Sequence, residues 1–542
     1  MTSASAQAST APSTQFDARG TWTVFAMTAI CMTVVAYNTT AAITILPNLK
    51  SDFDLRPVTL QWVMTIYTLA AASLVPIFGR LGDILRKIYV FIFGMAIFAV
   101  GALFVAVSPD SIFLLIGRLL QGIGAGTMVG NSLGVLTAAT PEDKRTFIFG
   151  LWSGMISLGM SLGPVIGGLF AEYANWRGIF VMDMVLLAIA ASIAVPVVRR
   201  NYVPDSRPPN ARFDYVGGVF MILLLAPLTY GLSMSGSAGW TSARVLLAFA
   251  IALVAGIIFF ITEMRVKQPL MHLHYFLHPR FVMSALGMAI SGYMLLAFFF
   301  YFNLFVQSPN TLHMSPVTAG LAVLPYSLVM FALSVTVPKI LAPYSFRWPV
   351  TIGMALMAIA CFLLAKTTNS TSYDALWWKL VILGIGFGLT FPLLPRVGLR
   401  LVREEDSGQA SGVINTSLFI GATIGVVVAG MASAIAVRSQ VWGVIAALPT
   451  DSYDRDELAT AVTYGSSGEI QKILGGLESA HTSQAIAAAL RTVQDDAFNA
   501  AILTGAVVSA LGAVLAIWLM RGPIPEPRAA AKLLPQDKAT AT

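Results

Sequence analysis

Long apolar runs alternate with short polar segments along most of the chain. The runs have about the 20 residues that a helix needs to cross the hydrocarbon core of a bilayer. Lipid cannot satisfy exposed backbone groups, so spanning segments of this length form helices. We therefore expect an all-α polytopic membrane protein with fourteen transmembrane helices, at 22–47, 58–80, 88–107, 111–138, 146–172, 177–197, 215–234, 242–264, 281–306, 316–338, 347–365, 375–395, 409–436 and 498–520.

Composition supports this interpretation. With 57% hydrophobic and 11% charged residues, the chain is more apolar than soluble globular proteins are. The two cysteines, Cys31 and Cys361, fall inside apolar runs, which argues against a disulfide framework or a cysteine-ligated metal. We expect no cofactor and no metal site.

Charge reports membrane topology. The net charge is +7, and most Lys and Arg residues lie in alternate connections between the runs, on the same side as both ends. Such a bias places basic loops in the cytoplasm. We expect a multi-pass protein of the inner (cytoplasmic) membrane with both termini cytoplasmic, and no nucleic-acid partner.

The chain contains an internal repeat. Gly122, Gly124, Gly126 and Gly150 recur 262 residues later as glycines, and further glycines follow in the same register. Repeats of this kind are typical of transporters. We expect a tail at 1–21, an N-terminal six-helix bundle at 22–197, a linker at 198–214, inserted helices seven and eight at 215–264, a C-terminal six-helix bundle at 265–520 and a tail at 521–542.

One extracytoplasmic segment, 438–497, is long and polar. Thr482 and Ser483 are candidate caps of a helix that leads into the last span. The segment is a connector, a cover over the outer vestibule or a docking surface, and it is too short for an enzyme domain.

A charged connection follows the second span. Gly79, Leu81 and Asp83 are followed by the basic residues Arg86 and Lys87. Charges of this kind belong at the water interface. The pattern resembles the loop between helices two and three of the major facilitator superfamily, although Arg86 stands where that family usually has a second glycine. The resemblance implies a gate loop that latches one face of the transporter.

The fifth span contains a proline between glycines: Gly159, Gly163, Pro164, Gly167 and Gly168. Proline kinks a helix, and glycines spaced by four give a thin packing face. The stretch resembles the antiporter motif of exporters in the superfamily. A purely structural kink is the alternative.

The closest resemblance is to drug:proton antiporters of the fourteen-helix EmrB/QacA type. It rests on the motifs above, on 176–180, on Gln61-Trp62 and on Gly239-Trp240, and it covers the chain from about Trp22 to Arg521. It implies a major facilitator fold with two six-helix bundles plus two inserted helices. It also implies efflux of drugs or other lipophilic toxic molecules by proton antiport, with a periplasmic adaptor protein as a further partner in hosts that have two membranes.

Two charged residues are candidates for proton coupling. Arg118 in the fourth span resembles the arginine that the family links to this task, and a charge there is costly unless it faces a polar partner. The family's usual acid in the first helix is replaced by Asn38, which cannot carry a proton. Asp183 in the sixth span is the leading substitute. A snorkelling arginine and a hydrated acid near the surface are the structural alternatives.

Polar and aromatic residues within the spans are candidates for a substrate cavity. An aromatic stretch with amides occupies 298–303, and it suits planar lipophilic molecules unless its rings pack in the core or face lipid. Our cavity candidates are Asn38, Thr39, Gln121, Tyr301, Asn303 and Asn415.

Other functions are less well supported. Two Gly-x-Ser-x-Gly matches, at 130–134 and 159–163, lie in apolar helices instead of the strand–turn–helix context of a nucleophile, so we expect no enzyme. His272, His274 and His278 have no acidic neighbour in the sequence, and we do not expect them to bind metal. The alternatives are an exporter of one metabolite, an anion included, and a non-transporting sensor or scaffold on the same fold.

Overall fold

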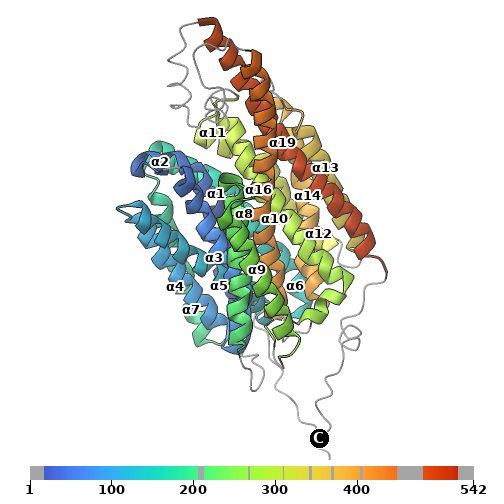
Figure 1. Cartoon of the computed structure of the whole chain (residues 1–542). Helices are drawn as coiled ribbons and strands as arrows, with labels where there is room; N and C mark the ends of the chain where they lie inside the picture. The colour runs from blue at the N-terminus through green and yellow to red at the C-terminus, as the bar shows by residue number, and fades with distance from the viewer. Residues whose placement is uncertain are drawn as a thin grey trace, which may run out of the picture.

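The computed structural model describes residues 18–522 except 56, 205–212, 267–268, 271, 309–310, 341–344, 368–371, 403–406 and 448–479. Within these residues all regular elements are helices (Figure 1). Thirteen helices are long and apolar enough to cross a membrane, and the bent pair α11–α12 supplies a fourteenth span. The prediction of an all-α polytopic fold with fourteen spans is confirmed.

The first half holds six spanning helices and one short helix. In chain order these are α1 (Ala18–Thr44), α2 (Leu46–Phe53), α3 (Pro57–Ile84), α4 (Lys87–Ala106), α5 (Ser111–Ala138), α6 (Glu142–Tyr173) and α7 (Gly178–Arg199). Two helices follow that belong to neither bundle, α8 (Tyr215–Ala238) and α9 (Ala243–Glu263).

The second half repeats the six spans with more interruptions. Its elements are η1 (Leu273–Leu277), α10 (Pro279–Gln307), α11 (Pro316–Ala322), α12 (Leu324–Ile340), α13 (Arg347–Leu364), η2 (Tyr373–Ala375), α14 (Trp377–Thr390), α15 (Leu393–Leu399), α16 (Ser407–Ala447) and α19 (Ala480–Leu519).

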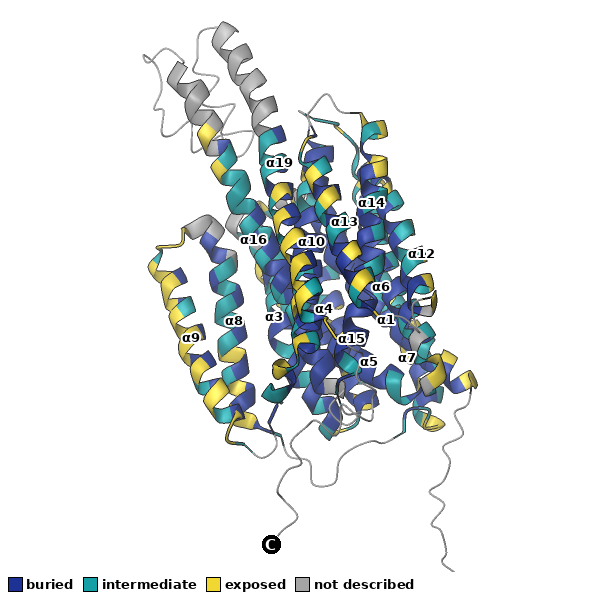
Figure 2. Ribbon diagram, turned by 90° about the vertical axis from the view of Figure 1, so that its right-hand side faces the viewer, coloured by how far each residue is buried: buried dark blue, intermediate teal, exposed yellow. Residues whose placement is uncertain are grey.

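The two halves stand side by side, with blue to teal helices on one side of Figure 1 and yellow to red helices on the other. We call the end with α2 and α11 the upper end, and the opposite end, where α19 ends, the lower end. Helix α8 packs against α3 of the first half and α16 of the second, and α9 packs against α8. Figure 2 shows this pair outside the bundles.

The glycine repeat corresponds to equivalent helix contacts. A Cβ at Gly122 of α5 would lie 2.5 Å from the carbonyl oxygen of Tyr67 on α3, and one at Gly384 of α14 would lie 2.4 Å from that of Tyr326 on α12. Backbones approach this closely only where no side chain intervenes. Each half is therefore built around the same close crossing.

Several helices extend beyond the apolar runs. Helix α1 begins at Ala18, four residues before the predicted span, and α2 continues past it to Phe53. Helix α16 reaches Ala447 and α19 begins at Ala480, so Thr482 and Ser483 lie inside α19 and do not cap it. The prediction failed here because hydropathy marks where a helix meets lipid, whereas a helix can continue into water.

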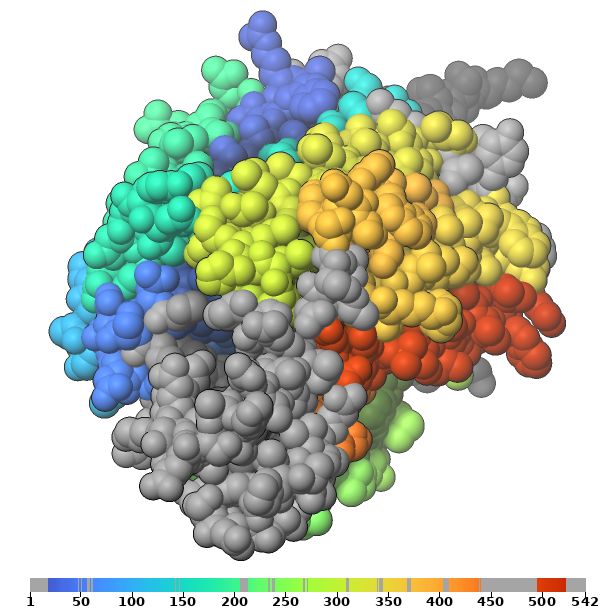
Figure 3. Space-filling view, turned by 90° about the horizontal axis from the view of Figure 1, so that it is seen from above, coloured from blue at the N-terminus to red at the C-terminus, as the bar shows by residue number. Residues whose placement is uncertain are grey.

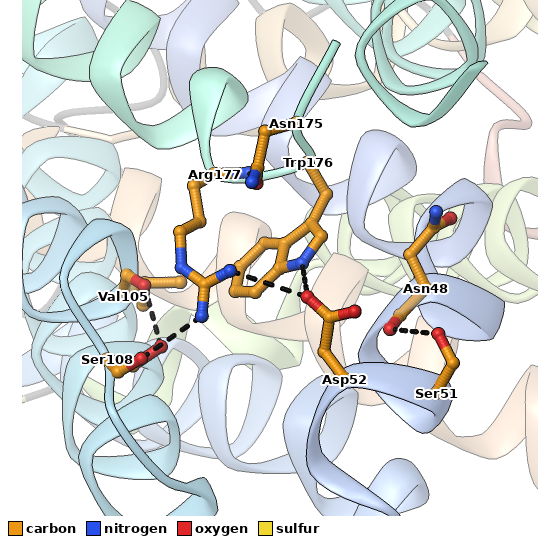
Figure 4. A network of polar contacts seen from close by, with 8 residues as sticks. All are labelled: Asn48, Ser51, Asp52, Val105, Ser108, Asn175, Trp176 and Arg177. Atoms are coloured by element: carbon orange, nitrogen blue, oxygen red, sulfur yellow. Dashed lines mark hydrogen bonds and ion pairs between the residues drawn. The ribbon is translucent and has the colours of Figure 1, made fainter. Parts of the chain in front are cut away.

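A polar network joins three connections at the upper end of the first half (Figure 4). Asp52 of α2 accepts hydrogen bonds from the Trp176 indole at 2.7 Å and the Arg177 guanidinium at 3.4 Å. Arg177 also donates to the Ser108 carbonyl oxygen at 3.2 Å and stacks on Trp176 at 4.3 Å. The network fixes the α1–α3, α4–α5 and α6–α7 connections to one another.

Candidate functional site

Charged groups are buried together in the first half, between α1, α5 and α7. Arg118 of α5 and Asp183 of α7 are both 0% exposed, and Asn38 of α1 and Gln121 of α5 are buried beside them. Burying a charge is costly unless hydrogen bonds and opposite charge compensate it. The partners of these side chains therefore decide whether the arrangement is stable.

Two amides connect the arginine to the aspartate. Asn38 accepts from Arg118 at 2.6 Å through its oxygen and donates to Asp183 Oδ2 at 2.7 Å through its nitrogen. Gln121 does the same, at 3.0 Å and 3.3 Å. Both amides are polarised in the same direction, from the cation to the anion, which strengthens such a chain. We call Arg118, Asn38, Gln121 and Asp183 the buried relay.

Two tyrosines complete the surroundings of the buried relay. The Tyr37 hydroxyl of α1 donates to Asp183 Oδ1. The Tyr67 ring of α3 lies 4.5 Å from the Arg118 guanidinium carbon, a cation–π distance. Arg118 also donates to the Val63 carbonyl oxygen at 3.1 Å, while its second terminal nitrogen has no hydrogen-bond partner among the described residues.

A separate cavity lies between the two halves. Its volume is about 60 Å³, room for about two waters. Its described lining is mostly aliphatic, aromatic and methionine side chains and contains no charged residue. The lining comprises Met32, Val35, Ala36, Thr39, Thr68, Val129, Trp152, Ile156 and Met160 from the first half, and Met288, Gly292, Leu295, Leu296, Phe391, Pro395, Asn415, Leu418, Phe419 and Ala422 from the second.

Polar groups are few in this cavity. Asn415 uses its nitrogen on Ser411 of its own helix, at 2.9 Å and 3.2 Å. The Trp152 indole N–H is buried and has no hydrogen-bond partner among the described residues. An unpaired buried donor costs free energy, and Trp152 is one of the residues that line the cavity.

Helix α1 connects the cavity to the buried relay. Tyr37 and Asn38 bind Asp183, whereas the next residue, Thr39, lines the cavity. The Thr39 hydroxyl lies 3.5 Å from the Tyr67 hydroxyl. The Tyr67 hydroxyl in turn donates to the Val35 carbonyl oxygen at 3.3 Å. A shift or rotation of α1 therefore changes both the cavity wall and the surroundings of Asp183.

The proline–glycine motif of α6 joins α1 to the second half. Cβ atoms at Gly159 and Gly163 would lie within 2.7 Å of α1 atoms, and one at Gly168 would lie 2.7 Å from Pro316 of α11. Gly167 also faces α1, and Pro164 lies against Gly320 of α11. In Figure 3 the yellow-green atoms of the second half, in the part of the chain that contains α11, lie directly against teal atoms of the first half.

The predicted gate loop is mostly helical. Gly79 and Asp83 lie within α3, and the turn is limited to the two residues before α4. Asp83 forms a buried ion pair with Lys87 at 3.0 Å, and Arg86 donates to Asn201 at 2.7 Å. At this lower end Gly412 of α16 packs against Pro76 of α3, so the loop adjoins a contact between the halves.

The repeat allows the surroundings of Tyr37 to be compared with those of its counterpart in the second half. Gly163 packs on the Tyr37 carbonyl oxygen, and its repeat partner Gly425 packs on that of Tyr293. Tyr37 donates to Asp183, whereas Tyr293 donates to Thr504 at 2.7 Å. The first half thus carries an ionisable acid where the second has a neutral hydroxyl.

The six residues predicted to line a substrate cavity are divided among three places in the structure. Of the six, Thr39 and Asn415 line the cavity, Asn38 and Gln121 belong to the buried relay, and Tyr301 and Asn303 are not part of the cavity lining. Asn303 accepts from Gln307 within α10. The rings of Phe298, Phe299 and Phe302 are buried in the core of the second half, packed on one another or on Tyr326.

Sequence reasoning missed Tyr37, Tyr67 and Trp152. Aromatic residues are common in spans, so their type alone gave no signal. The tyrosine pairs Tyr37/Tyr293 and Tyr67/Tyr326 do recur at equivalent places in the two halves. Their spacing differs slightly from that of the glycines, so an ungapped comparison of the halves does not align them.

Comparison with known proteins agrees with this architecture. The chain is 28% identical over 390 residues to the methylenomycin A resistance protein of Bacillus subtilis, which covers 71% of this chain and 81% of that protein. It is 26% identical over 432 residues to the multidrug efflux pump LfrA of Mycolicibacterium smegmatis, which covers 79% of this chain and 84% of LfrA. It is 29% identical over 400 residues to the cephamycin export protein CmcT of Amycolatopsis lactamdurans, which covers 73% of this chain and 81% of CmcT.

A solved structure shares the fold. The human organic anion transporter MFSD10 (TETRAN) superposes with a TM-score of 0.54 at 12% identity, covering 92% of this chain and 99% of that one. The sequence pattern of the Major Facilitator Superfamily matches residues 28–426. The chain belongs to the Major Facilitator Superfamily.

Proposed function

We propose that this protein is a secondary active exporter of lipophilic small molecules, driven by proton entry through Asp183. The observation that carries the proposal is the buried relay, which holds a fully buried acid next to the wall of a central apolar cavity. Similarity to resistance and efflux proteins supports the direction of transport. The proline–glycine motif of α6 supports antiport.

Protonation of Asp183 would remove the negative charge at which Tyr37, Asn38 and Gln121 point their donors. Arg118 would then be left as an uncompensated buried cation, which favours rearrangement of α1. Because Thr39 follows Asn38 directly, that rearrangement changes the cavity. One proton entering at 100 mV releases about 2.3 kcal/mol, enough for a gradient of a neutral substrate of roughly fiftyfold.

The cavity lining favours neutral lipophilic substrates. Its described side chains carry no charge to pair with a cation or an anion, and an ion moved there would lose hydration without compensation. The Trp152 N–H suits a substrate with a carbonyl or similar acceptor. An exporter of one anionic metabolite remains the alternative, with Arg118 as its anion partner after rearrangement.

Orientation follows from the basic residues. We place the lower end in the cytoplasm, both termini with it, and the protein in the cytoplasmic membrane. Arg86, Lys87, Arg199 and Arg400 all lie at the lower end, in accordance with the bias of basic residues toward the cytoplasm. The polar segment 438–497 is then extracytoplasmic, where a periplasmic adaptor would bind.

The test is substrate-induced proton release from purified protein in weakly buffered detergent solution, followed with a pH indicator dye. The ligands are a neutral lipophilic drug with a carbonyl group, a lipophilic cation and an organic anion. We expect the neutral drug to release protons from the wild type and to bind Asp183→Asn without release. Glu172→Gln, which removes an exposed acid from the end of α6, is the control and keeps the release.

The alternatives predict other results. Release by the anion alone would favour the exporter of one anionic metabolite. Ligand binding without release in both wild type and Asp183→Asn would exclude proton antiport. A sensor or scaffold would bind a ligand but give no flux in proteoliposomes with a pH gradient.

A further inference from the structure

A second cluster of charge lies at the lower end of the other half, away from the buried relay. Three arginines line one hollow: Arg280 at the start of α10, Arg347 at the start of α13 and Arg400 directly after α15. Phe346, Leu401 and Met520 form apolar parts of its wall. Elements distant in sequence thus bring three cations to one place.

No carboxylate among the described residues pairs with these arginines. Arg280 donates to the backbone carbonyl oxygens of Arg521 and Gly522 at the end of α19. Arg400 stacks on Phe346 at 4.9 Å, and Arg396 stacks on the same ring at 5.1 Å. The Nε atom of Arg347 is buried without a hydrogen-bond partner in the described part of the chain.

Two further features increase the positive potential in this hollow. Helix α13 starts here; its N-cap, Phe346, provides no side-chain acceptor, and Ser345 accepts a weak hydrogen bond from the Arg347 N–H at 3.4 Å. A helix N-terminus carries about half a positive charge. Partial burial lowers the pKa of Arg400, because its charge has lost part of its hydration. The hollow therefore favours an anion with several acceptor oxygens.

The surroundings indicate where that anion comes from. Trp348 follows Arg347 and is 56% exposed, and Trp518 near the end of α19 is 67% exposed. Arg347 and Arg521 stack on these two rings, each at 5.1 Å. Exposed tryptophans next to basic residues mark the membrane interface. Helix α13 packs against α19, and both expose aliphatic side chains above this level, including Ile352 and Val514.

We propose that the hollow lined by Arg280, Arg347 and Arg400 binds the phosphate of an anionic phospholipid whose acyl chains lie along α13 and α19. Arginine suits phosphate because its planar fork donates two parallel hydrogen bonds. Basic pockets between helices at the cytoplasmic side of membranes bind such headgroups. The bound lipid would tie the starts of α10 and α13 to the ends of α15 and α19. The inference does not depend on what the protein exports.

The experiment measures lipid binding to the purified full chain in detergent by native mass spectrometry. Phosphatidylglycerol is titrated against phosphatidylcholine with the same acyl chains. We expect the wild type to prefer phosphatidylglycerol and Arg347→Gln/Arg400→Gln to lose about fivefold in affinity for each charge removed. Arg199→Gln/Arg265→Gln is the matched control, because it removes two exposed basic side chains from the same end outside the hollow. It should retain the preference.

Three further measurements keep the proposal falsifiable. Arg347→Lys/Arg400→Lys keeps the charges but not the fork, and it should fold and bind more weakly than the wild type. Binding to the wild type should weaken as salt is raised. Inorganic phosphate at millimolar concentration should compete only slightly; if it binds as tightly as phosphatidylglycerol, the lipid assignment is wrong. Equal loss in both glutamine variants, or no preference over phosphatidylcholine, overturns the site.

Discussion

At the residue scale, Asn38 shows what an amide contributes at the position where the sequence resemblance predicts an acid. Its oxygen faces the cation Arg118 and its nitrogen faces the anion Asp183. A carboxylate has only acceptors and could not face both groups in this way. The acid of the buried relay lies on α7 instead, where Asp183 balances the charge of Arg118 through the two amides.

Replacing Asn38 by leucine tests this role. The substitution keeps the branched shape but removes one hydrogen-bond partner from Arg118 and one from Asp183, which retain Gln121. Hydrogen bonds to charged groups contribute about 1.5–3 kcal/mol each, so we expect a clear drop in melting temperature and loss of substrate-induced proton release. Asn415→Leu is the control for stability, since Asn415 is a buried amide that bonds to neutral Ser411 atoms in the described structure. Equal destabilisation by the two variants would contradict the role assigned to Asn38.

Trp152 is the residue at which specificity should be easiest to change. Its indole N–H has no partner in the described structure, so Trp152→Phe removes a donor at little cost in stability. For a carbonyl-bearing substrate we expect the transport KM to rise by about two- to tenfold, the value of one neutral hydrogen bond. A hydrocarbon-like substrate without acceptors should be transported as before, and a similar KM increase for both substrates would argue against the hydrogen bond.

Residue types in the sequence identified part of this site. Arg118 and Asp183 were found because a charge within a span is expensive and needs a partner. The division of Asn38 and Thr39 between the relay and the cavity was not predictable. Neighbouring residues on a helix point about 100° apart, and which of them faces a cavity depends on the rotation of α1 against α3, α6 and α7.

At the scale of elements, α6 is the helix that packs closely against both α1 and the second half. Because its glycines have no side chains, the backbone of α6 lies directly against α1 and, at Gly168, against α11. We therefore expect a movement of α1 to displace α6 and, with it, α11. The sequence motif predicted a kinked, thin-faced helix at this position. It did not predict which helices the face would contact, because partners in a bundle are set by tertiary packing.

Gly163→Ala should show how much the close packing of α6 on α1 contributes to stability and transport. A methyl group there would lie 1.9 Å from the Thr40 hydroxyl oxygen and 2.6 Å from the Tyr37 carbonyl oxygen, so α1 and α6 would have to separate. Overpacking of this kind costs roughly 1–3 kcal/mol, and we expect a lower melting temperature together with impaired transport. Gly256→Ala on α9 meets only the flexible end of Leu224 and is the control. A fully active Gly163→Ala would show that the close packing is dispensable.

Spans were predicted better than their ends or breaks. The bilayer imposes length and apolarity on each span, and both are visible in the sequence. The break at Val323 between α11 and α12 comes two residues before Pro325, and the break between α1 and α2 comes just before Pro47. Proline lacks a backbone N–H and disfavours a helical conformation in the residue before it, so the sequence marks where these breaks lie but not how far each helix continues beyond them.

For the whole molecule, the size of the central cavity implies motion. Ligand sites for drug-sized molecules have about 300–1,000 Å³, whereas this cavity has about 60 Å³. The halves also touch above it, at α6–α11, and below it, at α3–α16. The cavity is therefore too small for a drug-sized substrate in this arrangement, and we expect one of these contacts to open when a substrate enters.

Spin labels can follow this opening. One pair would join the upper ends, at Pro109 and Lys366, and a second pair the lower ends, at Arg199 and Leu277, all four being exposed. The native cysteines are buried and should not react. If the halves rock as rigid bodies, substrate binding lengthens one distance and shortens the other. Asp183→Asn, which mimics the protonated acid, should shift the same two distances in the absence of substrate, because Arg118 loses its counter-charge. Distances that stay fixed in every condition would mean that Asp183 does not control the opening, and the coupling would have to be sought outside the buried relay.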